Sequence, residues 1–316
     1  MKGLTQWLGA LSAAVLYLNT GNLQAGDYPQ WRGPQRNGVS PETGLLKEWP
    51  KEGPKLLWKV SDLGLGYSTP AVAGERLYVL KNEGLENESV VALNSKEGKS
   101  VWSARLGQVG NPKQQPNYPA ARSTPTVDGE LVYALGSDGD LFCLEAATGK
   151  ARWHKSLRAD FEGEPGKWAY AESPLIDRQT LVCAPGGSNA TVIALNKQTG
   201  DLIWKCAVPG GDQAAYASAI ISQAGGVKQY VLFLQKALVG VEAKTGKFLW
   251  RYDKTAKNSS ANIPTPLADG DYVYSAAGRS GGGLIKLKAN AGAFEVEEVC
   301  FSQKLPTSIG GAVKVG

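Results

Sequence analysis

Apolar and polar residues alternate in short runs along most of the chain, and glycine- or proline-containing turns separate the runs. The first well-formed unit contains runs at residues 68–73, 77–80, 89–93 and 99–102. Runs of about four to eight residues between such turns are typical of β-strands rather than helices. The pattern therefore predicts a unit of four consecutive strands.

This unit recurs with a fixed signature, in which a tryptophan follows a glycine turn by four residues. The pairs are Gly98 and Trp102, Gly149 and Trp153, Gly200 and Trp204, and Gly246 and Trp250. A fifth copy, residues 286–296, keeps Gly292 but has no tryptophan. The glycines are 51, 51, 46 and 46 residues apart, a period that suits a propeller blade and exceeds most helical repeats. We therefore expect an all-β fold, a β-propeller of about five four-stranded blades.

The recurring residues have a physical role in such a fold. Glycine permits the positive φ of a tight turn between the third and fourth strands. One indole per blade can fill the wedge between neighbouring sheets while its N–H finds a backbone acceptor. We expect the tryptophans to join adjacent blades, the alternative being that they belong only to the local core.

The segments just before and just after the repeats each match part of a blade. Residues 56–60 match the last strand of a blade without its first three, and residues 309–316 match the first strand of a new unit. Propellers protect their edges by pairing strands from opposite ends of the chain. We expect an incomplete part of an eight-bladed ring, cut at the start of a sixth blade and continued beyond Gly316.

The N-terminus carries the pattern of an export signal. Lys2 precedes a largely apolar stretch, and Ala25 offers a small residue before a cleavage site. We divide the chain into a signal peptide (1–25), a leader segment (26–55) and a partial propeller (56–316), and expect a periplasmic or secreted protein without a membrane span after signal removal. An uncleaved anchor is the alternative.

Composition excludes several kinds of chemistry. The formal charge of +5 is spread along the chain, so we expect no nucleic-acid partner. Four widely spaced cysteines contain no Cys-x-x-Cys pair, and His154 is the only histidine, which argues against a metal cluster. We assign no catalytic, cofactor-binding or metal-binding residue.

Alignment of the blade openings on their proline position suggests one surface. It places Tyr67, Arg122, Ala171, Tyr216 and Ile263 at equivalent positions near a channel mouth, with Tyr170 and Glu172 beside them. Tyrosine and arginine often anchor interfaces, so these side chains could bind a protein partner or a small polar ligand. The alternative is that they only form the channel wall.

The four copies of the glycine and tryptophan signature resemble the pyrroloquinoline-quinone-type propeller repeat over residues 56–316. The segment Tyr28–Pro34 is similar to the leader of exported bacterial proteins of this kind. The resemblance implies an eight-bladed ring and two branches of function. One comprises quinone-dependent alcohol or sugar dehydrogenases, which hold the quinone beside calcium and often have an adjacent Cys-Cys pair, which this chain lacks.

The other branch is non-catalytic and includes the lipoprotein that helps to assemble outer-membrane barrels. The chain resembles this branch, although no cysteine follows Ala25 for lipid attachment. Our expectation is therefore an exported, non-enzymatic scaffold that needs no cofactor and binds an unidentified protein. A quinone-dependent dehydrogenase with bound quinone and calcium is the alternative.

Overall fold

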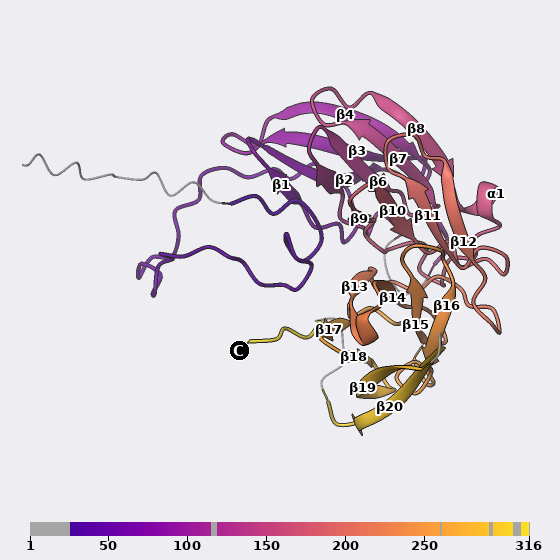
Figure 1. Ribbon diagram of the computed structural model, residues 1–316. Coiled ribbons are helices and arrows are strands. Elements are labelled where there is room, and N and C mark those ends of the chain that lie inside the picture. The colour runs from indigo at the N-terminus through magenta and orange to yellow at the C-terminus, as the bar shows by residue number, and fades with distance from the viewer. Residues whose placement is uncertain (1–25, 115–118, 260, 291–292, 306–310, 316) are drawn as a thin grey trace, which may run out of the picture.

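The computed structural model describes residues 26–114, 119–259, 261–290, 293–305 and 311–315. Five four-stranded antiparallel sheets follow one another along an arc, in chain order (Figure 1). In each sheet the strands are hydrogen-bonded in sequence order, as in a propeller blade. The predicted all-β fold of four-stranded blades is therefore confirmed.

The first two blades are built from strands of three to eight residues. Blade 1 contains β1 (Ala71–Ala73), β2 (Arg76–Glu83), β3 (Asn87–Asn94) and β4 (Ser100–Gly107). Blade 2 contains β5 (Thr126–Asp128), β6 (Leu131–Leu135), β7 (Asp140–Glu145) and β8 (Ala151–Ser156), and is followed by the short helix α1 (Leu157–Phe161).

The remaining blades repeat this order. Blade 3 contains β9 (Leu175–Asp177), β10 (Thr180–Cys183), β11 (Val192–Asn196) and β12 (Leu202–Cys206). Blade 4 contains β13 (Ile220–Ser222), the 3₁₀ turn η1 (Ala224–Gly226), β14 (Gln229–Phe233), β15 (Leu238–Glu242) and β16 (Phe248–Tyr252). Blade 5 contains β17 (Leu267–Asp269), β18 (Tyr272–Ala277), β19 (Gly281–Asn290) and β20 (Ala293–Ser302).

The hydrophobic core lies between the blades rather than inside any one of them. Each of the four largest apolar clusters takes side chains from two consecutive blades. The cluster between blades 2 and 3, for example, contains Tyr133, Leu141, Leu181 and Ile193. A sheet in this arrangement has two apolar faces, and each face is removed from water only when the next sheet packs against it.

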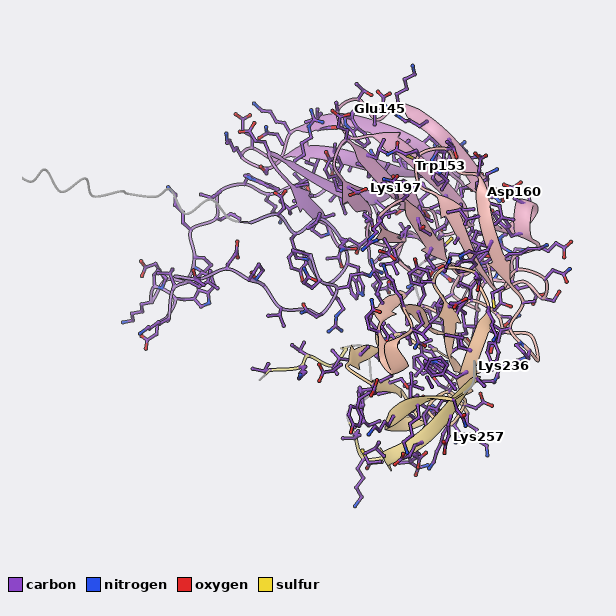
Figure 2. The ribbon with its side chains drawn as sticks, in the orientation of Figure 1. Glu145, Trp153, Asp160, Lys197, Lys236 and Lys257 are labelled. Carbon is purple, nitrogen blue, oxygen red and sulfur yellow. The ribbon has the colours of Figure 1, made fainter. Side chains whose placement is uncertain are left out.

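Tryptophans join the blades through a repeated contact. Trp102, Trp153 and Trp204 lie over the glycine turn of the next blade, and each indole N–H donates to the carbonyl three residues before that glycine. The acceptors are Ala146, Lys197 and Ala243, at 2.9, 2.9 and 3.1 Å. Figure 2 labels Trp153 and its acceptor residue Lys197 on adjacent blades.

The turn glycine has two reasons to lack a side chain. Gly98, Gly149, Gly200 and Gly246 have φ between 70° and 76°, in the left-handed region. A Cβ atom on Gly149 would also lie 2.5 Å from Cε3 of Trp102. The indole face therefore packs directly on the backbone of the turn.

Residues 56–60 form no strand, contrary to the expectation, because no described strand pairs with them. Trp58 nevertheless makes the blade-joining contact. Its ring lies against Gly98, and its Nε1 donates to the Ser95 carbonyl at 3.0 Å. Val60 and Leu63 also pack on the buried residues of blade 1. The segment thus covers the open face of blade 1 without belonging to a sheet.

Trp250 differs from the other repeat tryptophans. Its indole N–H donates to Gln229 in its own blade, and the ring lies over Gly240, where a Cβ would approach Nε1 to 2.1 Å. The missing side chain at Gly240 leaves room for the ring to fold across its own sheet. Trp250 is only 2% exposed and packs in the cluster between blades 4 and 5, so it still contributes to that interface.

The fifth copy is aligned differently from the expectation. In each of blades 1–4 a bulge follows the residue opposite the tryptophan, as between Ala92 and Leu93 in blade 1. In blade 5 the bulge follows Leu284, whose partner is Cys300, so Cys300 occupies the tryptophan position. Strands β19 and β20 then continue past the point at which the other blades turn. Gly292 lies outside the described residues.

The other flank of the array also differs from the expectation. Residues 311–315, the described part of the segment predicted to begin a new unit, form no strand. The Lys314 ammonium group bonds Asp269 at 2.7 Å, and the Ala312 carbonyl accepts from Arg32 of the leader. This segment therefore lies between blade 5 and the leader.

Replacement of a joining tryptophan should destabilise the protein. Trp102→Ala removes the indole and its hydrogen bond from the interface between blades 1 and 2, and we expect a loss of about 3 kcal/mol in the free energy of unfolding. Urea unfolding measures it. Trp49→Ala is the control, because Trp49 is 70% exposed. Equal urea midpoints for the two variants would contradict the role of the indole.

Thiol accessibility checks the placement of the cysteines. Cys143, Cys183 and Cys206 are buried, whereas Cys300 is exposed. A chromogenic thiol reagent should therefore modify one cysteine rapidly in the folded protein and all four in urea. Cys300→Ser should abolish the rapid phase, and its survival in that variant would show that the position of Cys300 in β20 is wrong.

Candidate functional site

The five segments that lead into the first strand of each blade converge on one cavity. Its volume is about 280 Å³. The residue three positions before the proline position lines it in every blade, and these residues are Tyr67, Arg122, Ala171, Tyr216 and Ile263. The cavity thus brings together the five residues that the repeat alignment places at equivalent positions.

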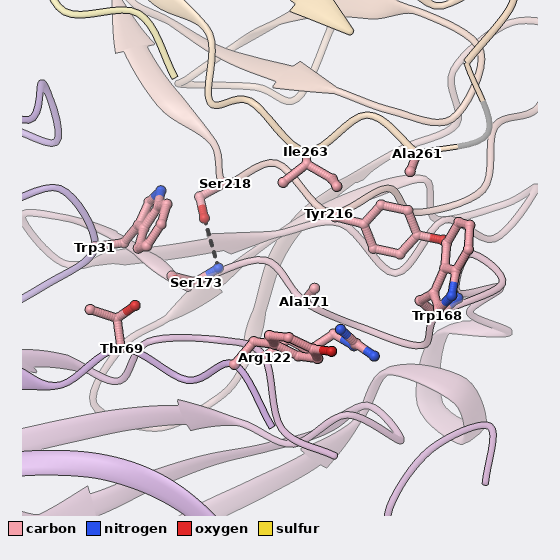
Figure 3. A pocket seen from close by; sticks show the side chains of 11 residues that line it. Trp31, Thr69, Arg122, Trp168, Ala171, Ser173, Tyr216, Ser218, Ala261 and Ile263 are labelled. Carbon is pink, nitrogen blue, oxygen red and sulfur yellow. Dashed lines mark hydrogen bonds between the residues drawn. The ribbon is translucent and has the colours of Figure 1, made fainter. Parts of the chain in front are cut away.

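The residue just before the proline position faces the same cavity in several blades. Thr69, Ser173 and Ser218 line it through these positions. Side chains that are two residues apart in an extended segment point to the same side, which explains why both positions line one wall. The hydroxyls also link neighbouring blades. The Thr124 amide donates to Ser173 Oγ at 2.9 Å. The Ser173 amide donates to Ser218 Oγ, also at 2.9 Å (Figure 3).

Tyr170 and Glu172, which were expected beside this surface, do not line the cavity. They flank Ala171, and the same alternation sends their side chains to the opposite side. Tyr170 is 1% exposed and donates to the Pro185 carbonyl, and Glu172 accepts from the Ala184 amide. Both side chains therefore hold the opening of blade 3 to its own sheet and are closed to a partner.

In other blades too, the residue at the position of Glu172 hydrogen-bonds to the second strand of its own blade. Its equivalents are Ser68 and Ser123, which hydrogen-bond Leu80 and Leu135 at the matching place on the second strand. Glu172 is longer than serine and also lies near the Arg36 guanidinium, whose charge partly opposes the effect of burial on its pKa.

The leader forms the base of the site. Tyr28 pairs with Val72 of blade 1, and the Val127 amide of blade 2 donates to the Pro29 carbonyl. Trp31 lines the cavity, and its Nε1 donates to Thr265 Oγ1 before blade 5 at 2.8 Å. The leader therefore contacts inner segments from both sides of the arc.

Arg36 fixes the leader to the middle of the arc. Its guanidinium donates to the carbonyls of Ser173, Pro174 and Ala219, at 2.9, 3.2 and 3.0 Å. The side chain is 6% exposed, and burial lowers its pKa to about 10, so it stays charged at neutral pH. One cation thus satisfies carbonyls from blades 3 and 4 that would otherwise be buried without donors.

The opposite side of the cavity is aromatic (Figure 3). The Trp168 and Tyr216 rings meet edge to face with centroids 5.8 Å apart, and the Trp168 amide donates to the Tyr216 hydroxyl at 3.2 Å. Arg122 lies over the Tyr67 ring, 4.6 Å from its centroid. Trp168 Nε1 is buried and has no hydrogen-bond partner. The wall thus combines large apolar faces, one cation and one indole donor.

The sequence did not single out Trp31 and Trp168 as members of this site. Both lie outside the repeat signature, Trp31 in the leader and Trp168 in the connection between blades 2 and 3. Residue-by-residue alignment of blades has no equivalent position for either of them. Only the path of the leader and the loop brings them to the cavity.

The lining does not fit a quinone held beside calcium. Calcium takes six to eight oxygen ligands, usually including carboxylates, and none of the cavity-lining residues that the structure describes is acidic. In the described part of the chain, no group of three His, Cys, Asp or Glu residues is placed to hold a metal ion.

Among the same residues, no helix has the length and apolar character needed to cross a bilayer.

The blades, their tryptophan contacts and the axial cavity define a propeller of the pyrroloquinoline-quinone repeat type. The family model described as "Outer membrane protein assembly factor BamB" matches residues 36–161 and 86–313, and the chain belongs to this family.

Curated relatives and solved structures agree with this assignment. The chain is 26% identical to outer membrane protein assembly factor BamB of Moranella endobia over 215 residues, which cover 66% of the chain and 47% of that protein. It is 30% identical to BamB of Salmonella typhimurium over 92 residues, 29% of the chain and 22% of that protein. The chain thus spans less than half the length of these relatives.

The structural matches show the fold. BamB from Moraxella catarrhalis matches with a TM-score of 0.57 at 15% identity, over 80% of this chain and 69% of that one. Quinohemoprotein alcohol dehydrogenase from Comamonas testosteroni matches with a TM-score of 0.56 at 16% identity, over 87% and 46%. The fold alone therefore does not separate a scaffold from a dehydrogenase.

Two buried carboxyl groups should make stability depend on pH. Burial raises the pKa of Glu88, which accepts from Ser137 across blades 1 and 2, to about 7, and it raises the pKa of Glu172 to about 7. The ordinary value is 4.5. The folded protein therefore keeps protons that the unfolded chain releases, and this stabilisation is lost as pH rises from 4.5 through 7.

We expect a higher urea midpoint at pH 5 than at pH 8. Glu88→Gln, which is neutral at every pH, should reduce that difference, while Glu86→Gln on the exposed end of the same hairpin should leave it unchanged. A pH dependence identical in Glu88→Gln and the parent protein would contradict the assignment to Glu88.

Proposed function

We propose that this chain is a periplasmic, non-enzymatic scaffold that binds protein partners during outer-membrane protein assembly. Membership of the BamB family carries the proposal, since the matched relatives are described as assembly factors for outer membrane proteins. The site supports binding rather than catalysis because its lining offers aromatic faces, hydroxyls and one cation.

The architecture is suited to a fixed surface on which protein partners bind. The blades are fixed to one another by indole contacts, and the segments that open them are fixed by hydroxyl and Arg36 contacts. Tyr67 is 49% exposed at the rim of the cavity, and a half-buried Arg122 lies over its ring. Rigid aromatic and arginine side chains beside a cavity are typical anchors of protein interfaces, because binding orders few further groups.

Deletion of the gene in its host tests the role in assembly. We expect less folded β-barrel protein in the outer membrane, measured from the heat-modifiable migration of barrels on gels, and recovery when the parent gene is restored. A similarly expressed periplasmic protein serves as the control. Unchanged amounts of folded barrels after deletion would contradict the proposed function.

A direct assay separates the scaffold from a quinone-dependent dehydrogenase. The purified chain is incubated with pyrroloquinoline quinone and calcium and then dialysed. We expect no retained quinone absorbance and no dye-linked oxidation of alcohols or sugars, because the lining supplies no carboxylate for calcium. A known quinoprotein dehydrogenase treated identically is the positive control, and stoichiometric quinone retention with turnover would overturn the non-enzymatic assignment.

A further inference from the structure

The axial cavity has the composition of a site for an anion with an aromatic group. Among the described residues that line it, Arg122 is the only charged one. Trp31, Tyr67, Trp168 and Tyr216 supply ring surfaces. None of these described lining residues carries a carboxylate that would repel an incoming anion, so the local charge is complementary to a carboxylate.

The cavity size restricts the ligand. Its volume of about 280 Å³ lies just below the usual range of about 300–1,000 Å³ for small-molecule sites. That space accommodates one large side chain with its neighbouring backbone rather than a folded domain or a large cofactor. Ring faces on several sides favour an aromatic side chain, since such pairs gain more than area burial alone.

A donor with no acceptor points to a polar ligand group. Trp168 Nε1 is buried and makes no hydrogen bond, although its neighbours Tyr216 and Lys167 hold the rest of the residue in place. Buried indole N–H groups normally have acceptors. In the view of Figure 3 the Arg122 guanidinium and the Trp168 ring lie toward the same end of the cavity.

From these observations we propose that the cavity binds a segment of a protein partner in which an aromatic side chain adjoins a carboxylate. The aromatic ring enters between the tyrosine and tryptophan rings, and the carboxylate is held by Arg122 with an oxygen directed to Trp168 Nε1. This proposal rests on the proposed function and specifies what the scaffold recognises.

The test uses three fluorescein-labelled decapeptides that are identical Gly/Ser sequences except for a central Phe-Asp, Phe-Asn or Ala-Asp pair. Binding to the whole chain is followed by fluorescence anisotropy. We expect the Phe-Asp peptide to bind at least about tenfold more tightly than either of the others, the effect of one charge-assisted contact or one buried ring.

Two variants assign the contacts. Arg122→Gln should bring the affinity for Phe-Asp down to that for Phe-Asn, and Trp168→Phe, which keeps a ring but removes the indole donor, should weaken Phe-Asp binding several-fold. Arg279→Gln is the matched control because Arg279 lies exposed in the turn between β18 and β19. Urea midpoints confirm that each variant is folded, and Trp168→Phe decides the test should Arg122→Gln not fold.

Equal affinities for Phe-Asp and Phe-Asn, no binding of any peptide at about 1 mM, or Phe-Asp binding unchanged in both variants would each overturn this inference. The gene-deletion result is independent of it. Loss of folded barrels together with failure of the peptides would leave the scaffold role intact and refute only the ligand, whereas peptide binding without any effect of deletion would refute the role.

Discussion

The contact between an indole and the glycine turn of the next sheet is the interaction on which the structure depends. Each blade is a small sheet with two apolar faces, and neither face is covered from within the blade. Trp102, Trp153 and Trp204 each cross to the following blade and end on a backbone carbonyl there. Packing and hydrogen bonding therefore act at the same place, and they fix the position of one sheet on the next.

The departures from this contact are informative. Trp58 makes it although its segment belongs to no sheet, so the indole and not the strand covers the face of blade 1. Trp250 turns back over Gly240 and packs with Ile285 and Leu287 in the apolar cluster between blades 4 and 5. The contact thus persists where the strand is absent, whereas in blade 4 the indole folds over its own sheet, where Gly240 leaves room for it.

The site follows from the same architecture. Repetition places five equivalent openings around one axis, and alternation along each opening selects the residues that face inward. The leader closes the base, where Arg36 satisfies carbonyls of two blades and Trp31 contributes a ring. The segments that line the cavity are therefore held by hydrogen bonds of Arg36, Ser173 and Ser218 as well as by the packing of the blades.

The sequence by itself determined the repeat, the strand order, the turn glycines and the five equivalent positions of the cavity wall, because local periodicity and turn chemistry are encoded within single blades. Tertiary structure alone decided that Tyr170 and Glu172 face the sheet, that Cys300 takes the place of a tryptophan, and that Trp31 and Trp168 join the site. Those outcomes depend on the direction of a side chain across an extended segment, on the pairing of one strand with another, and on the path of segments outside the repeat. None of these is fixed by the spacing of residues along the chain, since each arises only when strands pair and when the leader and the connecting segments pack against the blades.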